Sequence, residues 1–523
     1  MTLIRQQARS SAFVLVGVLI VVLLVSMIAL SVLFRMRSDE TAAATGSSGE
    51  QAWASALSGV RIAMKIAASI RPGDTDWQDA PDRFKDQLLY EDGSEEWHWT
   101  LFTSDGEGGI RFGLSDESSK INLNTAANSL VARLPSMKAS LTDALLDFLD
   151  ADDLPRPEGA EQEYYDALPQ PYRILNGPLA TVEQLLLIRG FTPSIVFGED
   201  ANRNFTLDAN EDDGDEHTPP DNNDGKLSLG LKPFLTVYSK EFNRDSRGVA
   251  RIRLNATTNS LSETNGLPPA FVAFLAELQA SDSVILHSSD LLETSIRLKD
   301  RNGQNREVPT GVGRDSLALV LDQFTGSDPS EIQGRININT ASITVLQTIP
   351  GIDPSLAETI VSARAALPAE RRQSIAWLYV ENLVEADKFR EIAPSLTSRG
   401  FQFSFNVVGF GVRSGHFRVL QAVIDVNEPT PKLLYLRDLT RLGLPFPIQS
   451  EENDPSDSNA SPPLPSNQTA SPKASTPNRR SRRGLSNFSL KLNRRRKRFC
   501  DEIFPRILPS GVGEKHQSRA VSF

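Results

Sequence analysis

The stretch Phe13–Phe34, FVLVGVLIVVLLVSMIALSVLF, contains no charged residue and is the strongest structural signal in the sequence. As a helix with a rise of ~1.5 Å per residue, its 22 residues would be about 33 Å long, enough to cross a hydrocarbon core of ~30 Å. A cleaved signal peptide, the competing interpretation, would have an apolar run of only about 7–15 residues. We therefore expect residues 13–34 to form a retained transmembrane helix, preceded by a basic leader at residues 1–12.

A second helical signal follows the apolar segment. Apolar residues recur at spacings of three and four, at Trp53, Leu57, Val60, Met64 and Ala67. This spacing predicts an amphipathic stem helix over residues 35–71, which ends at Arg71-Pro72-Gly73. The helix could pack against its own domain or against neighbouring subunits.

Alternating apolar residues on both sides of a long helical region predict one sheet built from two distant parts of the chain. The alternating positions are Trp97, Trp99, Leu101, Ile110, Phe112 and Leu114 in the first part and Phe401, Phe403, Phe405 and Val407 in the second. We therefore expect an α+β fold in which an antiparallel β-domain, residues 72–115 and 399–446, is interrupted by a large helical insertion, residues 116–398.

The insertion contains a repeat. KINLNTA at 120–126 recurs as RININTA at 335–341, with a weaker echo, RIRLNA, at 251–256. IRGFTP at 188–193 similarly recurs as IPGIDP at 349–354. Asn and Thr are favoured helix caps and Gly tolerates the positive φ of a tight turn. We expect two related units, 116–235 and 236–398, with hairpin turns at Gly190 and at Pro350-Gly351.

The hairpin around Pro350 and Gly351 has the form of a helix-hairpin-helix motif. In versions that bind DNA, the hairpin amides and a following positive charge hold a phosphate. Here Asp353 follows the turn, and the nearby cations are Arg189 and Arg364. These charges favour a structural hairpin over DNA binding, which remains the alternative.

An acidic segment between Glu199 and Asp224 has the spacing of a calcium loop. Oxygen-bearing residues occupy positions 1, 3, 5, 7, 9 and 12 of a twelve-residue stretch, namely Asp200, Asn202, Asn204, Thr206, Asp208 and Glu211. This is the ligand pattern of an EF-hand-type loop, in which oxygens converge on one Ca²⁺. Phe205 departs from the pattern at position 6, where the sharp turn normally has Gly. We predict a calcium site; a solvated acidic linker is the other interpretation.

The charge distribution separates the folded body from the C-terminal segment. Residues 471–523 carry 14 Lys and Arg against three acidic residues, so the net charge of −11 divides into +11 there and −22 in residues 1–470. Residues 450–478 are rich in Ser, Pro and Asn and are followed by clusters of Arg, so we expect residues 447–523 to form a disordered basic tail. Such a tail could contact anionic surfaces or simply be solvated.

Several classes of chemistry have no support in the sequence. The single Cys500 excludes intrachain disulfides and CxxC motifs, and the five histidines form no HExxH pair. Neither GxGxxG nor GxxxxGK[ST] occurs, and we find no nucleophile and base in a catalytic pattern. We expect a protein that is not an enzyme.

These features together resemble the K-type minor pseudopilins (GspK family) of the type II secretion system. The resemblance runs from about Gln6 to Leu439. It rests on the leader and apolar helix, the interrupted sheet, the repeated INxNTA and further motifs: LDADD at 149–153, YY at 164–165, PY at 171–172, NGP at 176–178 and VEQLL at 182–186.

The resemblance implies a pilin-like β-domain with a helix-hairpin-helix or SAM-like insertion, and processing by a prepilin peptidase at Ala12/Phe13. The family's junction usually has Gly where this chain has Ala12. Counting from Phe13, the fifth residue is Gly17, where major pilins carry a Glu. A carboxylate in an apolar stack is tolerable when it neutralises a neighbour's ammonium, so its absence suits a subunit with no chain above it.

The function implied is capping of the tip of the type II secretion pseudopilus, in support of pseudopilus assembly and protein export. The partners would be the I- and J-type minor pseudopilins, the major pseudopilin, the prepilin peptidase and the membrane, with the bulk of the chain periplasmic and the single span in the bacterial inner membrane. The alternative is a membrane-anchored DNA-uptake receptor similar to ComEA that uses the Pro350-Gly351 hairpin.

Overall fold

The computed structural model describes residues 4–93, 95–126, 128–214, 216–255, 266–281, 283–299 and 305–448. Of the predicted basic tail, 447–523, all residues after Ile448 lie outside the described part, as do residues 1–3 of the predicted leader. Side chains are described from Val14 onward.

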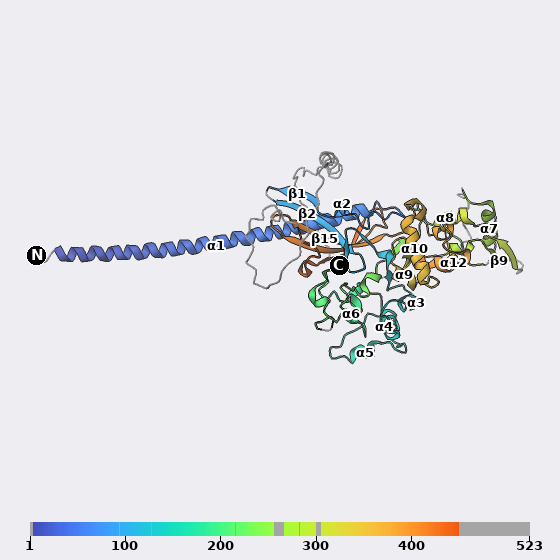
Figure 1. Cartoon of the computed structure of the whole chain (residues 1–523), viewed down its shortest axis with the longest axis horizontal. Helices are drawn as coiled ribbons and strands as arrows, with labels where there is room; N and C mark the ends of the chain where they lie inside the picture. The colour runs from blue at the N-terminus through green and yellow to red at the C-terminus, as the bar shows by residue number, and fades with distance from the viewer. Residues whose placement is uncertain are drawn as a thin grey trace, which may run out of the picture. The chain divides into compact units, whose positions relative to one another are not determined.

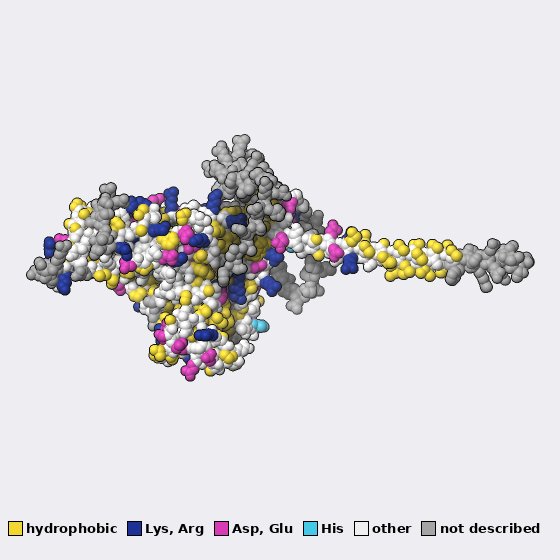
Figure 2. All heavy atoms as spheres, turned by 180° about the vertical axis from the view of Figure 1, so that it is seen from behind, with side chains coloured by type: hydrophobic (Ala, Val, Ile, Leu, Met, Phe, Trp, Pro, Cys, Tyr) yellow, Lys and Arg dark blue, Asp and Glu magenta, His cyan; other side chains and the backbone are white. Residues whose placement is uncertain are grey.

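One long helix, α1 (Ile4–Ala67), contains both the predicted membrane span and the predicted stem (Figure 1). Every described side chain from Val14 to Ser47 is exposed, and Figure 2 shows hydrophobic side chains covering much of this part of the helix. Beyond it the helix lies against a sheet, and it ends at Ala67, before the predicted end at Arg71. The first part of α1 therefore has an apolar surface that the rest of the described chain does not cover.

The sheet joins strands from both ends of the described chain. Its strand order is β1-β2-β15-β16-β17, with short strands β3 beside β2 and β4 beside β15. All pairs are antiparallel, and β2 meets β15 with Asn406 opposite Phe102 and Gly411 opposite Trp97. The interrupted antiparallel sheet confirms the predicted α+β class. The bounds are β1 (Gln87–Asp92), β2 (Glu95–Ser104), β3 (Ile110–Arg111), β4 (Ser115–Asp116), β15 (Gln402–Gly411), β16 (Phe417–Asp425) and β17 (Lys432–Asp438), with the short helices α2 (Pro81–Phe84) and η8 (Thr440–Leu442) nearby.

Alternation along the strands divides the sheet into two apolar faces. The face toward α1 contains Trp99, Leu101, Phe403, Phe405, Val407, Leu420, Ala422 and Ile424. The opposite face is built from Phe102, Val408, Phe410 and Val419, on which Leu444 and Phe446 pack. Both faces are covered, which accounts for the nearly continuous burial of β15.

Small residues bring α1 close to the sheet. Ala52, Ala56 and Gly59 are buried on the helix side, and Gly409 lies opposite them on β15. A Cβ atom on Gly409 would collide with the backbone of Ala52 and Ala56, and one on Gly59 would lie 2.7 Å from Val407. The closest part of this helix–sheet contact therefore depends on the absence of side chains.

The predicted apolar stripe of the stem only partly coincides with the buried face. Val60 and Ala67 are buried, whereas Trp53, Leu57 and Met64 are half-buried. The reason is that the small residues occupy the centre of the contact and the larger apolar residues flank it.

Within the described part of the insertion, three segments are each closed by a pair of two-residue parallel strands. The first segment lies between β5 (Ile121–Asn122) and β6 (Leu235–Thr236), the second between β8 (Ile252–Arg253) and β11 (Phe324–Thr325), and the third between β13 (Ile336–Asn337) and β14 (Leu396–Thr397). We call them units 1, 2 and 3. The predicted second unit, 236–398, thus contains two such segments, and RIRLNA at 251–256 marks the start of unit 2.

The units enclose the remaining helices and strands. Unit 1 contains α3 (Asn128–Val131), α4 (Ala139–Leu149), α5 (Gln162–Asp166), η2 (Val182–Leu187), α6 (Pro193–Phe197), η3 (Ala209–Glu211) and η4 (Lys232–Phe234), and is preceded by η1 (Glu117–Ser119). Unit 2 contains α7 (Pro269–Gln279), η5 (Ser288–Leu291), β9 (Ser295–Lys299), β10 (Asn305–Pro309) and α8 (Arg314–Gln323). Unit 3 contains α9 (Ile343–Thr348), α10 (Pro354–Ala366), η6 (Ala369–Arg372), α11 (Trp377–Val380), α12 (Ala386–Ile392) and η7 (Ala393–Ser395).

Equivalent hydrogen bonds repeat in the three units. After each opening strand, a backbone N–H donates to the carbonyl of the closing threonine: Leu123 to Thr236, Leu254 to Thr325 and Ile338 to Thr397, at 2.8–2.9 Å. The next asparagine donates its amide N–H to a distant carbonyl: Asn124 to Leu179, Asn255 to Ile285 and Asn339 to Arg372. The repeated Asn is therefore a structural residue in every unit.

The connections between units pair with each other, and the cores merge. β7 (Lys240–Phe242), which leads from unit 1 to unit 2, pairs antiparallel with β12 (Glu331–Gln333), which leads from unit 2 to unit 3. The buried apolar residues of the described insertion form one continuous cluster from Ile121 to Leu396. Figure 1 shows α4, α5 and α6 of unit 1 apart from α7, α8 and β9 of unit 2, with α9 and α10 of unit 3 between them.

The close helix–sheet contact predicts the effect of adding a methyl group there. Gly409→Ala should lower the free energy of unfolding by about 1–3 kcal/mol, because the new Cβ forces α1 away from β15. Gly177→Ala, whose Cβ would meet no atom closer than 3.6 Å, is the matched control and should change stability little. Denaturant unfolding followed by circular dichroism measures both, and equal stability of the two variants would contradict the proposed contact.

Candidate functional site

The exposed part of α1 has the length and composition of a membrane span. It includes an 18-residue window of mean hydropathy 3.0, none of which is buried. Ala12 and Phe13 lie within α1, but their side chains are outside the described part. Gly17 is exposed, and a Cβ on it would meet no atom within 4 Å. The surface around Gly17 is therefore open to lipid or to a neighbouring helix.

Hydrogen bonds close the predicted calcium loop on itself. Asp200 accepts from the backbone N–H groups of Asn204 at 3.0 Å and Phe205 at 3.3 Å. At the other end, Glu211 accepts from the backbone N–H of Asp208 at 3.2 Å. Asp200 and Glu211 are 2% and 1% exposed, and burial raises the pKa of both carboxyls above their ordinary values. The first and last predicted ligands are thus buried carboxylates of one closed loop.

The middle residues of the loop converge on Asp208. The amides of Asn202 and Asn204 donate to Asp208 Oδ2 at 2.6 and 3.0 Å, and Asn204 Oδ1 accepts from the backbone N–H of Thr206 at 2.7 Å. In this arrangement amide nitrogens face the carboxylate. Among the described residues, the acidic side chains of the loop do not form a group of three whose ligand atoms all lie within 4.8 Å of one another.

Phe205, the departure from the calcium-loop pattern, has the backbone conformation that the pattern requires. Its φ is +61°, in the left-handed region normally occupied by Gly at position 6. Its ring lies edge-on to Phe102 of β2, with centroids 6.4 Å apart, on the sheet face opposite α1. The phenylalanine therefore attaches the acidic loop to the sheet, which Gly could not do.

The predicted hairpin turns are formed by glycines with positive φ, +85° at Gly190 and +90° at Gly351. Pro350 precedes the second turn, which joins α9 to α10. Asp353 caps α10 by accepting from the backbone N–H of Leu356 at 2.8 Å. A Cβ on Gly351 would lie 2.7 Å from a carboxylate oxygen of Glu391. Two carboxylates therefore lie beside the turn where a phosphate would have to approach.

The cations near the hairpins are also engaged. Arg364 donates to the carbonyls of Ile338 and Ala341 at 3.1 and 2.6 Å, and burial lowers its pKa to about 10. Arg189 lies over the ring of Tyr164 at 4.8 Å and donates to a carbonyl of unit 1. The arrangement favours a structural hairpin, as the sequence predicts, and gives DNA binding no support.

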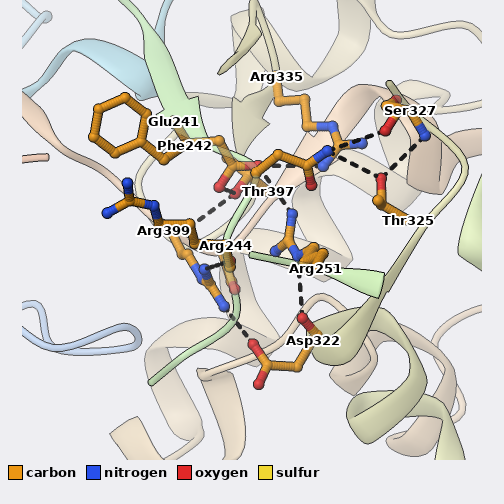
Figure 3. Close-up of polar contacts among 12 residues, drawn as sticks. Glu241, Phe242, Arg244, Arg251, Asp322, Thr325, Ser327, Arg335, Thr397 and Arg399 are labelled. Atoms are coloured by element: carbon orange, nitrogen blue, oxygen red, sulfur yellow. Dashed lines mark hydrogen bonds and ion pairs between the residues drawn. The ribbon is translucent and has the colours of Figure 1, made fainter. Parts of the chain in front are cut away.

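Two buried glutamates close units 1 and 3 in the same way. Glu117 accepts from Lys120 Nζ at 2.5 Å and from the Thr236 hydroxyl, at the two ends of unit 1. Glu241 accepts from Arg335 Nη1 at 3.2 Å and from Thr397 Oγ1 at 3.4 Å, the equivalent positions of unit 3 (Figure 3). Each glutamate is 4% exposed.

Unit 2 contacts one of these glutamates, Glu241. Arg251 Nη1 lies 4.0 Å from Glu241 Oε1, and Arg251 Nε donates to the carbonyl of Asp322 at 3.0 Å. Arg399, just after unit 3, donates to the Asp322 carboxylate at 2.5 Å. Figure 3 shows these side chains pointing toward one another from separate strands and loops. Glu241 thus holds arginines from two units, and burial of Arg251 lowers its pKa to about 10, which leaves it charged near neutral pH.

Asp116 attaches the start of the insertion to its last unit. Its carboxylate accepts from Asn337 Nδ2 and Thr340 Oγ1, both at 2.7 Å, and from the backbone N–H of Ser118 at 2.8 Å. Asp116 also pairs with Phe403 of β15. Burial raises the pKa of this carboxyl to about 6. The chain leaving the sheet is therefore bonded to unit 3, through which it later returns.

Sequence reasoning missed Asp116, Glu117 and Glu241. The repeated motif did contain a signal, because each copy begins with a basic residue, Lys120, Arg251 or Arg335. A second signal is a Thr after an apolar residue at the end of each unit, in LTVY at 235–238, FTGS at 324–327 and LTSR at 396–399. A basic residue that is removed from solvent needs an acidic partner, and a threonine hydroxyl beside it can donate to the same carboxylate. Glu117 and Glu241 provide these carboxylates.

Residues 116–197 match the family described as type II secretion system (T2SS), protein K. This part of the chain is similar to a domain of protein K. This match confirms the predicted resemblance to the K-type family, and a helix-hairpin-helix motif matches residues 332–373, around α9 and α10.

A solved structure is also similar, at 13% sequence identity and a TM-score of 0.35, over 77% of this chain and 99% of the other. It is the crystal structure of the GspK-GspI-GspJ complex from the enterotoxigenic Escherichia coli type 2 secretion system. No curated protein matches the chain significantly.

The pairing of the buried Glu241 with Arg251 and Arg335 predicts that substituting this glutamate strongly destabilises the fold. Glu241→Ala should lower the free energy of unfolding by about 3–5 kcal/mol, because it leaves Arg251 and Arg335, whose side chains are 8% and 15% exposed, without their carboxylate. The control is Glu307→Ala, which removes a carboxylate from the pair Arg297–Glu307, whose side chains are each 68% exposed, and should cost less than about 1 kcal/mol. Chemical unfolding of both variants tests this prediction. Similar losses of unfolding free energy would show that Glu241 has no special role.

Proposed function

We propose that this protein is a minor pseudopilin of the type II secretion system, anchored in the bacterial inner membrane by residues 13–34 with the rest of the chain in the periplasm. The observation that carries the proposal is the combination of a region similar to protein K with an interrupted sheet that holds one half of α1 while leaving the other half apolar and exposed. A helix of this kind can insert in a bilayer and later stack beside the helices of other subunits.

We place the subunit at the tip of the pseudopilus, in support of assembly and export. Gly17 leaves the helix without a carboxylate that could pair with the N-terminus of a chain above it. The insertion, units 1 to 3, adds a bulk that could not be repeated along a narrow fibre. Both features suit a position that occurs once in the fibre.

The proposed partners follow from this position. The helix would contact the I- and J-type minor pseudopilins and the major pseudopilin, and the prepilin peptidase would act on Ala12 and Phe13 before assembly. The role is structural and involves no catalysis by this chain.

Processing provides the direct test of this function. The protein extracted from membranes of cells that contain a prepilin peptidase should begin at an N-methylated Phe13, as measured by N-terminal mass spectrometry. Ala12→Gly, which restores the family's usual residue, should be cleaved at the same bond at least as completely. An intact Met1, or an N-terminus beyond Phe34, would refute the assignment.

We further propose that the Asp200–Glu211 loop binds calcium. Its donors are carboxylates, amides and carbonyls, the hard oxygen ligands that Ca²⁺ prefers, and Phe205 has the conformation of the required turn. Rotation of the Asn202 and Asn204 amides would present oxygens where their nitrogens now face Asp208. A bound ion would then fix the loop that Phe205 attaches to the sheet.

Calorimetry tests the calcium loop. Asp200→Ala/Glu211→Ala should lose one calcium-binding event that the wild-type chain shows, because two buried carboxylate ligands are gone. Glu216→Gln, an exposed acidic residue of the same segment outside the ligand positions, should bind as the wild type does. Identical titrations of the wild type and the double variant at millimolar calcium would rule out this site.

A further inference from the structure

A large cavity lies over one end of the sheet face that is opposite α1. Its volume is about 580 Å³, a size typical of small-molecule sites. The sheet forms one wall with Asn406, Gln421 and Tyr435, unit 1 contributes Glu183 to a second wall, and unit 3 contributes Val361 to a third. The cavity is therefore enclosed by parts of the chain that are far apart in the sequence.

Alternation along the strands gives the cavity a polar wall. Val408 and Phe410 make one end of this sheet face apolar. Asn406, two residues before Val408 on β15, points to the same face and is paired in register with Gln421 of β16. Tyr435 of the edge strand β17 follows on this side of the sheet, opposite Val423. Two amides and a phenol thus replace the apolar side chains where the sheet meets the cavity.

These polar side chains have no partner in the fold. Asn406 lies at the base of the cavity and is 4% exposed, and its Oδ1 atom is buried without a hydrogen-bond partner. Within the described part of the chain, the side chains of Gln421 and Tyr435 form no hydrogen bond either. Buried polar groups of native proteins nearly always have partners, so this wall is built to meet a polar ligand.

The charges of the lining indicate a neutral ligand. Most charged side chains there already have partners: Glu183 with Lys232 at 2.7 Å, Glu117 with Lys120 at 2.5 Å, and Arg111 and Arg364 with backbone carbonyls. An ionic ligand would have to break these contacts. The groups that remain available are the amides and the phenol, which are uncharged.

The same groups favour a saccharide over a peptide. The amides of Asn406 and Gln421 both donate and accept, as the hydroxyl groups of a sugar do. The rings of Tyr435 and Tyr238 and the side chain of Val361 offer apolar surface to the C–H groups of a sugar ring. A peptide usually joins a sheet at its edge, through free backbone groups, whereas β15 and β16 are already paired on both sides.

We propose that this cavity binds a neutral saccharide of one or two sugar rings, with hydroxyl groups bonded to Asn406 and Gln421 and a ring against Tyr435. Asp105, on the turn between β2 and β3, and Ser342, at the start of α9, are exposed residues of the lining, so the ligand can enter between them. The site goes beyond the proposed role in secretion and does not depend on it.

Calorimetric titration tests the site directly. The full chain, extracted in a polyoxyethylene detergent without a sugar headgroup, is titrated with N,N′-diacetylchitobiose, a neutral disaccharide. One binding event should appear, and Gln421→Leu should weaken it by about tenfold or more, because hydrogen bonds to the ligand are lost. Gln333→Leu, which removes an exposed amide of β12 outside the cavity, is the control and should bind as the wild type does.

A second variant separates loss of the site from loss of the fold. Asn406→Leu replaces a buried, unpartnered amide with an apolar side chain of similar shape, so its thermal unfolding midpoint without ligand should equal or exceed that of the wild type. It should nevertheless bind the disaccharide about tenfold more weakly or worse. The proposal is overturned if the wild type shows no heat at millimolar disaccharide, as for a cavity that holds only water, or if neither variant weakens the binding. Binding of N-acetyl-triglycine amide in place of the disaccharide would show a peptide site and would also overturn it.

Discussion

The antiparallel pairing of β2 with β15 is the constraint on which the rest of the structure depends. These strands provide the centre of the sheet that holds α1, yet all three units of the insertion lie between them in the chain. The insertion must therefore begin and end at the same place. Asp116 meets this requirement directly, because its carboxylate bonds to Asn337 and Thr340 of unit 3 while its backbone pairs with Phe403 of β15. The long loop closure is thus compensated by contacts at its two ends.

The sequence predicts the sheet and the apolar helix well because each depends on local periodicity. Alternation at Trp99 and Leu101, and again at Phe403 and Phe405, requires no knowledge of the partner strand. The face of α1 that contacts the sheet was harder to predict. Ala52, Ala56 and Gly59 bury little apolar surface, so a search for large apolar residues passes over them. Small residues are required at these positions because the helix backbone approaches Gly409 closely, and this approach is visible only in the folded structure.

The division of the insertion into three units could not be predicted from the sequence, for a different reason. Units 1 and 3 share a motif of seven similar residues, whereas unit 2 keeps only RIRLNA and contains the hairpin of β9 and β10. The closing strands are two residues long, too short to have a periodic signal. Their pairing is nevertheless the same in all three units, because the threonine carbonyl and the motif's backbone N–H recur. The glutamates that neutralise the basic residues lie outside the units, so no repeat search could include them.

Unit 1 has two acidic segments, Asp200–Glu211 and Asp150–Glu161, and beside the second, one carboxylate oxygen from each of Asp147, Asp150 and Glu161 lies within 4.8 Å of the others. At Asp200–Glu211 every second residue has a side-chain oxygen, so the pattern of a calcium loop is visible in the sequence. At Asp150–Glu161 the alternation is broken by Pro155, Arg156 and Pro157, and the third carboxylate, Asp147, comes from the preceding helix. Helical geometry brings Asp147 beside Asp150, since residues three apart share a face. A linear pattern therefore cannot show where a helix and a loop place their carboxylates together.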